Sequence, residues 1–288
     1  MQIDDYKTPI DPTWCPGCGD FGILMAMKKA LVELEVNPHE AVFTFDIGCS
    51  GNMADKVNGY GFKSLHGRSI ATASGVSIAN PNLKIIATGG DGGLLEEGIS
   101  HLMWAARSNY NLTAVMHNNQ IFGLTTGQPT VTTERHQPGK TATSAGVIEQ
   151  TLNPIQIALV SKASFVARGY SGDLQYLTEI IKAGINHNGF AFIDALQPCV
   201  TYNKHNTFKW FGERIYKLKE EKKYDPTDWD LAFKTGSEWE EKIATGILYQ
   251  GKEAVPYNKQ LPQRKDKKTR IVDEVKKPSI SKFIAEFE

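Results

Sequence analysis

The chain has 288 residues, of which 41% are hydrophobic and 22% are charged, proportions that are typical of a soluble globular protein. Its formal net charge is zero, which argues against a nucleic acid or an anionic membrane as its partner. The acidic N-terminus lacks the apolar segment of a secretory signal, and no apolar run is long enough to cross a bilayer. We therefore expect a cytoplasmic protein, in which grouped cysteines suggest metal or redox chemistry rather than structural disulfides.

Short apolar, β-rich runs alternate with segments of helical periodicity through residues 20–205. Helices are expected at 22–34, 69–80, 95–109, 154–164 and 174–186. Strands are expected at 41–48, 83–90, 112–119, 165–169 and 190–196. This alternation predicts an α/β fold with a mostly parallel sheet and helices on both faces. Ligands of such sheets bind at the carboxyl ends of the strands.

Positive charge is concentrated in the last third of the chain. Residues 206–288 hold 18 of the 32 Lys and Arg residues and contain few strand-like runs. We therefore divide the chain into an α/β domain, 1–205, and a charged C-terminal extension, 206–288, which would pack on the core or on a partner subunit. A docking surface for an acidic protein is the alternative.

Two polar segments follow strands that are separated by one helix. Gly-Asp-Gly at 90–92 ends one strand, and Asn118-Asn119 ends the next. A right-handed β-α-β crossover brings both carboxyl ends to the same edge of the sheet, so Asp91 and Asn119 are expected to meet. Carboxylate and amide oxygens suit Mg²⁺ or Ca²⁺, and glycines allow backbone N–H groups to approach a diphosphate. These segments predict a site for a metal ion and a diphosphate.

The spacing of the two segments resembles the thiamine diphosphate signature, because 25 residues separate Gly92 from Asn118. The segments match neither a Walker A loop nor the G-x-G-x-x-G dinucleotide fingerprint. By the resemblance, Mg²⁺ would be bound by the Asp91 carboxylate, the Asn119 side chain and the Ile121 backbone carbonyl.

The chain has four cysteines, Cys15, Cys18, Cys49 and Cys199. Cys49 and Cys199 each follow a predicted strand, at the same edge as the diphosphate site, and four thiolates meeting there could hold a [4Fe–4S] cluster. A thioredoxin-like site is disfavoured, because no buried strand leads into Trp14-Cys15. Structural zinc usually uses two close cysteine pairs, and unrelated buried cysteines are the remaining alternative.

Several blocks of sequence together resemble the β subunit of 2-oxoacid:ferredoxin oxidoreductases and cover most of residues 14–200. They are WCPGCGDFGIL, DIGCSG, YGFKSLHGRSIATASGVSIANP, GGDGG with HLMWAARSN, HNNQIFGLTTGQ and QPC. YGFKSLHGR, NTFKWFGERIYKL and ATGILY are similar to the subtype that acts on 2-oxoglutarate. Gly51 and Asn52 depart from that pattern, since relatives often carry a larger or charged residue there that helps to select the 2-oxoacid.

The resemblance implies a thiamine diphosphate-binding domain of the pyrophosphate type, with thiamine diphosphate, Mg²⁺ and one [4Fe–4S] cluster as cofactors. Cys15, Cys18, Cys49 and Cys199 would ligate the cluster. The thiamine diphosphate would contact Ile47, Gly48, Cys49, Ser50, His66, Gly92, Gly93, Gly123 and Leu124. His117 is interpreted as a packing residue.

The resemblance also implies the reaction and the partners. The expected reaction converts 2-oxoglutarate and coenzyme A to succinyl-CoA and CO₂, with electrons passing through the cluster to ferredoxin, or runs in reverse. Pyruvate or another 2-oxoacid is the alternative substrate, and a non-redox thiamine decarboxylase or a zinc-stabilised binding module is an alternative function. No catalytic residue is assigned to this chain, because relatives take the required glutamate from an α subunit. We expect such a partner in an (αβ)₂ heterotetramer.

Overall fold

The computed structural model describes residues 1–264, 267, 269–275 and 281–286. The rest of the charged extension, 265–266, 268, 276–280 and 287–288, lies outside the described residues. An eight-stranded sheet forms the centre, in the order β2-β1-β3-β4-β8-β7-β10-β9. All neighbouring strands pair in parallel except β10, which is antiparallel to β7. The strands of this sheet are β1 (Ala41–Phe45), β2 (Tyr60–Lys63), β3 (Lys84–Gly90), β4 (Leu112–Asn118), β7 (Phe165–Tyr170), β8 (Phe190–Leu196), β9 (Ile215–Lys217) and β10 (Ile243–Gln250).

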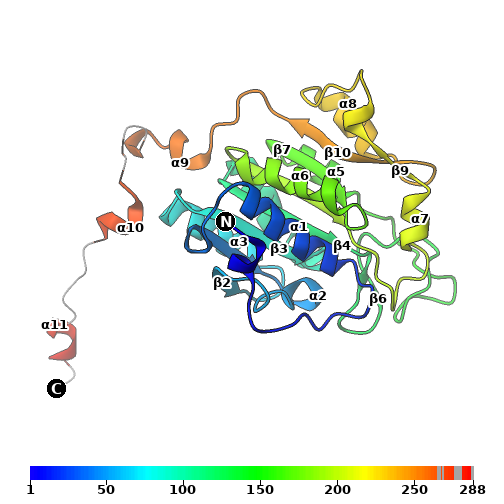
Figure 1. Cartoon of the computed structure of the whole chain (residues 1–288), viewed down its shortest axis with the longest axis horizontal. Coiled ribbons are helices and arrows are strands. Elements are labelled where there is room, and N and C mark those ends of the chain that lie inside the picture. Colours follow the sequence, from blue (N-terminus) through cyan, green and yellow to red (C-terminus); the bar gives the residue numbers. More distant parts are fainter. Residues whose placement is uncertain (265–266, 268, 276–280, 287–288) are drawn as a thin grey trace.

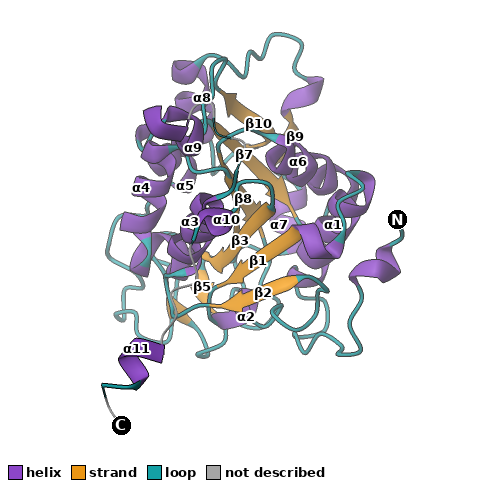
Figure 2. Cartoon of the chain, turned by 90° about the vertical axis from the view of Figure 1, so that its left-hand side faces the viewer, coloured by secondary structure: helices purple, strands orange, loops and turns teal. Residues whose placement is uncertain are grey.

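Helices cover both faces of the sheet, as the sequence predicts (Figures 1 and 2). One face packs against α1 (Asp20–Glu33) and α6 (Leu174–Asn186), and their apolar side chains share one core cluster. The other face packs against α3 (Ser69–Ala79), α4 (Ile99–Ser108), α5 (Pro154–Val160) and α8 (Trp229–Gly236), which share a second cluster. β4 and β8 lie in the middle and are fully buried, as expected for strands covered on both sides.

Shorter elements connect this framework. The short helices are α2 (Gly48–Gly51), α7 (Phe208–Gly212), α9 (Tyr257–Gln260), α10 (Ile271–Glu274) and α11 (Ser281–Ile284). Single turns of 3₁₀ helix lie at Ile3–Tyr6, Pro38–Glu40, Leu218–Glu220 and Pro262–Arg264, and β5 (Ile121–Phe122) pairs with β6 (Gln128–Pro129) as a separate ribbon.

The predicted elements are present, with two informative differences. The strand expected at 41–48 ends at Phe45, because the Asp46 carboxylate accepts the N–H groups of Ile47 and Gly67 and turns the chain. The helix expected at 95–109 is preceded by a π-helical segment, η3 (Gly92–Glu97), and α4 begins only at Ile99. π-helical turns are often found at functional sites.

The sheet continues into the charged extension, which the sequence analysis did not anticipate. β10 joins β7 with a register irregularity between Ile247 and Tyr249, and β9 forms the edge of the sheet. After β10, α9 stays bonded to the layered body through the Tyr257 N–H and the Asn109 carbonyl, and α10 lies against α3, whereas Figure 1 shows α11 at the far end of the extension. Residues 206–250 therefore belong to the core structure. Among the described residues, no helix is long and apolar enough to cross a membrane.

Candidate functional site

The polar segments singled out by the sequence follow four strands that are neighbours in the sheet. β1, β3, β4 and β8 lie side by side and are parallel, so their carboxyl ends meet at one edge. Asp46 follows β1, Asp91 follows β3, Asn119 follows β4 and Gln197 follows β8. The topology therefore brings together residues that are up to 151 positions apart in sequence.

One pocket at this edge, the glycine-lined pocket, contains every residue that the sequence analysis assigned to thiamine diphosphate or to Mg²⁺. Its volume is about 80 Å³. The predicted residues that line it are Ile47, Gly48, Cys49, Ser50, His66, Asp91, Gly92, Gly93, Asn119, Ile121, Gly123 and Leu124. The sequence analysis did not assign four further residues that line it, Gly90, His117, Phe122 and Thr125.

Asp91 is the buried carboxylate of the pocket. Its Oδ2 atom accepts hydrogen bonds from the hydroxyls of Thr130 and Thr132, each at 2.5 Å. Burial raises the pKa of Asp91 to about 6, although the two threonine hydroxyls act in the opposite direction. A buried carboxylate with an upward-shifted pKa is costly to keep ionised, which is the condition that a bound cation would relieve.

A chain of polar contacts connects Asp91 to the middle of the sheet, in which the single hydroxyl hydrogen of Thr132 can be donated either to Asp91 or to Asn118. Thr132 Oγ1 lies 3.3 Å from Asn118 Oδ1, and Asn118 Nδ2 donates to Asp194 Oδ1 at 2.9 Å. The second oxygen of Asp194 accepts from Arg168 Nε at 3.0 Å, and both residues of this ion pair are fully buried. These contacts link the position of the Asp91 carboxylate to side chains in the middle of the sheet.

Asn119 is held in place by its neighbours. Its Oδ1 atom accepts the Ile121 N–H at 3.0 Å, and its Nδ2 atom donates to Gln197 Oε1 at 2.8 Å. Asn203 donates to the Asn119 backbone carbonyl at 3.0 Å. Both polar atoms of the amide are therefore oriented, and Asp91 and Asn119 line the same pocket as the sequence predicts.

His66 lies at the pocket with two carboxylates beside it. Its Nδ1 atom is 2.7 Å from Glu97 Oε2 and 3.6 Å from Asp46 Oδ1. Asp46 is buried, and burial raises its pKa, while the N–H groups of Ile47 and Gly67 lower it. Both carboxylates lie within ion-pair distance of the imidazole, but His66 Nδ1 has no hydrogen-bond partner among the described residues. The sequence analysis had not identified either carboxylate.

The two glycines after Asp91 have no room for a side chain. A Cβ atom on Gly92 would lie 2.3 Å from the Phe122 ring, and one on Gly93 would lie 2.5 Å from Asp46 Oδ2. Their backbone therefore packs directly against the walls of the pocket at the start of η3. Glycines in such a position allow close backbone approach to a ligand.

We expect Gly92→Ala to lower the free energy of unfolding by about 1–3 kcal/mol, because the new methyl group overlaps the Phe122 ring. Chemical denaturation measures this change. Gly75→Ala is the matched control: Gly75 lies within α3, and a Cβ atom added there would meet no other atom within 4 Å. Alanine at that position should stabilise the protein by up to about 1 kcal/mol. Equal stability of Gly92→Ala and the wild type would contradict the close packing at Gly92.

The four cysteines are all free thiols and lie around the same edge. A Cβ atom on Gly123 would lie 3.2 Å from Cys49 Sγ and 3.8 Å from Cys199 Sγ, so these two thiols flank one backbone position. Burial raises the pKa of Cys49 to about 12, and repulsion from Asp20 and from the thiols of Cys199 and Cys15 adds to the shift. The influence of the neighbouring thiols on Cys49 shows that the cysteines form one group.

Neighbouring side chains hold the first two cysteines against the others. The Trp14 indole N–H donates to the Cys49 backbone carbonyl at 2.8 Å. Gln197 Nε2 lies 3.3 Å from Cys18 Sγ. Among the described residues, no three His, Cys, Asp or Glu side chains are close enough to share a single metal ion.

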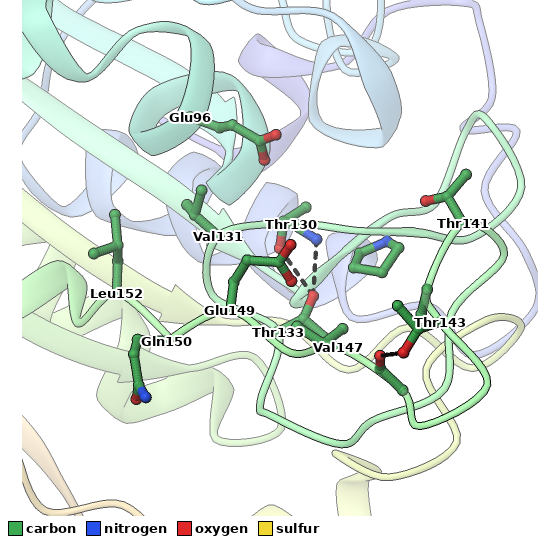
Figure 3. Close-up of a pocket in the computed structure, with 13 residues that line it drawn as sticks. Glu96, Thr130, Val131, Thr133, Thr141, Thr143, Val147, Glu149, Gln150 and Leu152 are labelled. Carbon is green, nitrogen blue, oxygen red and sulfur yellow. Dashed lines mark hydrogen bonds between the residues drawn. The ribbon is translucent and has the colours of Figure 1, made fainter.

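A second hollow of about 310 Å³ lies near the pocket and is lined by residues that include Thr130 (Figure 3). Figure 3 shows Thr130 and Thr133 hydrogen-bonded to each other in its wall. The charged side chains among the described residues that line it are Glu96 and Glu149, so it does not suit a phosphate or a carboxylate. The glycine-lined pocket is the better candidate for a diphosphate.

Comparison with protein families gives two matches along the chain. Residues 46–195 match the family described as thiamine pyrophosphate enzyme, C-terminal TPP binding domain. Residues 199–266 match the family described as the C-terminal part of the pyruvate ferredoxin oxidoreductase beta subunit. The first match includes the whole glycine-lined pocket.

Individual relatives agree with these families. The 2-oxoacid:ferredoxin oxidoreductase 1 subunit beta of Aeropyrum pernix is 41% identical over 271 residues, which cover 91% of this chain and 85% of the relative. The 2-oxoglutarate synthase subunit KorB of Methanocaldococcus jannaschii is 35% identical, over 72% of this chain and 77% of the relative.

Among solved structures, the 2-oxoglutarate:ferredoxin oxidoreductase of Magnetococcus marinus, determined with 2-oxoglutarate, coenzyme A and succinyl-CoA bound, is similar to the whole chain. The match has a TM-score of 0.88 and 31% sequence identity, and it covers 100% of this chain and 96% of the other. The sequence blocks, the parallel sheet with its glycine-lined pocket and these relatives agree. The chain belongs to the family of 2-oxoacid:ferredoxin oxidoreductase beta subunits.

Proposed function

We propose that this chain is the beta subunit of a 2-oxoglutarate:ferredoxin oxidoreductase that forms succinyl-CoA and CO₂ and passes electrons through a [4Fe–4S] cluster to ferredoxin, or catalyses the reverse carboxylation. The observation that carries the proposal is the convergence of twelve predicted cofactor and metal residues in one pocket, with the cysteine group beside it. The names of the KorB relatives and of the Magnetococcus structure favour 2-oxoglutarate over pyruvate.

The residues of the pocket fit Mg²⁺ and a diphosphate. Asp91, Asn119 and the backbone of Ile121 offer three oxygen ligands, and the cost of burying the Asp91 charge is what a cation would offset. Gly92 and Gly93 present bare backbone to the diphosphate. When bound, thiamine diphosphate supplies the electron sink for decarboxylation of a 2-oxoacid. The chain itself positions the cofactor through these oxygen ligands and glycines.

The cysteine group fits a [4Fe–4S] cluster. A cluster takes four cysteine ligands, and the four free thiols lie near one another beside the pocket. Because burial raises the pKa of the Cys49 thiol, the positive charge of bound iron is needed to keep it deprotonated. Cys49 also lines the glycine-lined pocket, so it would place the cluster beside the thiamine.

An α subunit is part of this proposal for two reasons. The pocket of about 80 Å³ is well below the roughly 300–1,000 Å³ of a complete cofactor site, so its residues form only part of the surroundings of the cofactor. No glutamate is among the described residues that line it, whereas thiamine activation requires one against the aminopyrimidine ring. We propose that the α subunit supplies both, in an (αβ)₂ heterotetramer.

The test is an anaerobic assay of the co-purified α and β subunits with coenzyme A and ferredoxin. Reduction of ferredoxin is expected to be fastest with 2-oxoglutarate, and slower with pyruvate and branched 2-oxoacids. The β chain alone should be inactive. Faster turnover of pyruvate would overturn the substrate assignment, and full activity of the β chain alone would overturn the role of the α subunit.

A further inference from the structure

A buried aspartate–histidine pair links the cysteine group to the glycine-lined pocket. Asp20 is the first residue of α1 and follows the second cysteine, while His117 lies in β4, 97 positions later. His117 Nδ1 lies 2.6 Å from Asp20 Oδ1, and both side chains are at most 1% exposed. The pair plays no part in the function proposed above. The sequence analysis interpreted His117 as a packing residue, whereas in the structure it lines the pocket.

The pair leaves one ring nitrogen of His117 without a partner. A carboxylate can only accept, so the Nδ1 atom carries the hydrogen in this contact, and the Nε2 atom remains available. Among the described residues, the buried Nε2 atom has no hydrogen-bond partner. Buried polar atoms of native proteins are nearly always paired, and an exception calls for an explanation.

The position of His117 provides that explanation. His117 lines the same pocket as Cys49 and Asn119. In ligand-binding histidines, an outer-shell carboxylate fixes one ring nitrogen and leaves the other free for the ligand. With its hydrogen on Nδ1, the His117 ring offers Nε2 as an acceptor, so the fitting partner is a donor group of the ligand that fills the pocket.

Asp20 faces the cysteine group with its second oxygen. Its Oδ2 atom lies 3.5 Å from Cys18 Sγ. After burial, repulsion from the Asp20 carboxylate is the largest cause that raises the pKa of the Cys18 and Cys49 thiols. One carboxylate therefore contacts a cysteine of the group with one oxygen and orients a pocket histidine with the other.

We propose that His117 contacts the thiamine diphosphate and that Asp20 is a positioning residue, which aims His117 into the pocket and sets the charge beside the cluster. This inference rests on the proposed function, because it assumes thiamine in the pocket and a cluster on the cysteines. A purely structural Asp–His bond would hold α1 against β4 without affecting either cofactor.

The experiment compares His117→Phe, Asp20→Ala and Asp20→Asn in the co-purified complex. Asparagine keeps an oxygen for His117 Nδ1 but removes the charge, whereas alanine removes both. His187→Phe is the matched control, because His187 also bonds through a ring nitrogen, to Ser164 at 2.7 Å, but does not line the pocket. The readouts are thiamine diphosphate affinity, from calorimetry, and the reduction potential of the cluster, from a titration followed by electron paramagnetic resonance.

The affinity for thiamine diphosphate should fall about tenfold or more in His117→Phe and Asp20→Ala, and stay within about threefold of wild type in Asp20→Asn and the control. The cluster potential should rise in both Asp20 variants, because a negative charge beside a ligating thiolate opposes reduction. Wild-type thiamine affinity in His117→Phe would overturn the contact, and an unchanged potential in both Asp20 variants would overturn the link to the cluster.

Two outcomes separate this inference from the proposed function. If the wild-type complex binds no thiamine diphosphate, the proposed function fails. If the wild type binds it and the His117 and Asp20 variants bind it equally well, only the further inference fails. Should Asp20→Ala not fold, Asp20→Asn still tests the potential and His117→Phe still tests the contact.

Discussion

Asp91→Asn is expected to stabilise the metal-free protein and to abolish its binding of Mg²⁺ and thiamine diphosphate. The Asp91 carboxylate is 1% exposed, and burial raises its pKa from 3.8 to about 6. The folded protein therefore binds the proton more tightly than the unfolded chain, so stability falls as the pH rises from about 4 to 6. A difference of about two pKa units corresponds to roughly 3 kcal/mol at neutral pH.

Asparagine removes this cost and keeps the two threonine hydrogen bonds, because its Oδ1 atom can still accept from Thr130 and Thr132. Chemical denaturation of the metal-free protein at pH 7 should therefore show a gain of up to about 3 kcal/mol, which shrinks toward pH 4 as the wild-type carboxyl becomes protonated. Calorimetry should show no binding of thiamine diphosphate in the presence of Mg²⁺, since the anionic metal ligand is missing.

Asp11→Asn is the matched control for this substitution. Asp11 is an exposed aspartate, so its replacement should change stability by less than about 0.5 kcal/mol and leave cofactor binding intact. A loss of stability in Asp91→Asn at pH 7 would contradict the burial argument. Retained metal-dependent binding would contradict the ligand assignment.

The buried Asp91 carboxylate is expected to lower the stability of the metal-free protein at neutral pH and to bind Mg²⁺ when the cofactor is present. The fold supplies a rigid base for Asp91 through Thr132, Asn118 and the buried Arg168–Asp194 pair. The desolvation cost of the ionised Asp91 carboxylate is offset only when a cation binds beside it. Functional sites commonly carry such local costs.

The sequence predicts the framework of this site because the rules for parallel sheets are strong. Alternating strands and helices place successive strand ends at one edge, and this alone is sufficient to bring Asp91 and Asn119 into one pocket. The strand Phe190–Leu196 and the helix Leu174–Asn186 agree with the predicted bounds. Both are buried elements with clear apolar periodicity.

The missed elements lack that periodicity. β2 is fully exposed and has glycine at its second position, so no apolar run marks it. β10 contains Gly246, at φ +130°, and pairs through an irregular register, so its sequence does not mark it as a strand of the main sheet. Its position depends on the strand beside it, which local sequence does not encode.

The missed site residues belong to contacts between distant segments. Thr130 and Thr132 reach Asp91 from a loop about 40 residues later, and His117 meets Asp20 across 97 positions. Threonine in a loop and histidine in a buried strand have no distinctive local pattern. Asp46 directly precedes a predicted cofactor loop, and its adjacency to Ile47 was a signal that could have identified it.

Cys199→Ala is expected to remove the [4Fe–4S] cluster while leaving the thiamine pocket intact. Cys199 lies beside Cys49 near Gly123 but does not line the pocket, whereas Cys49 does. A cluster held by four cysteines should be lost or degraded when one ligand is replaced by a methyl group. The affinity for thiamine diphosphate should stay near that of the wild type, because no pocket residue changes.

The purified wild-type complex should therefore show the broad visible absorbance and, after reduction, the paramagnetic signal of an iron–sulfur cluster, and Cys199→Ala should show neither. The Cys199→Ala complex should also fail to reduce ferredoxin, because the cluster is the proposed electron acceptor beside the thiamine. Val200→Ala is the matched control, because it shortens the adjacent, partly exposed side chain without removing a thiol. A colourless wild-type protein that contains zinc would instead establish the alternative, and an intact cluster in Cys199→Ala would remove this cysteine from the ligand set.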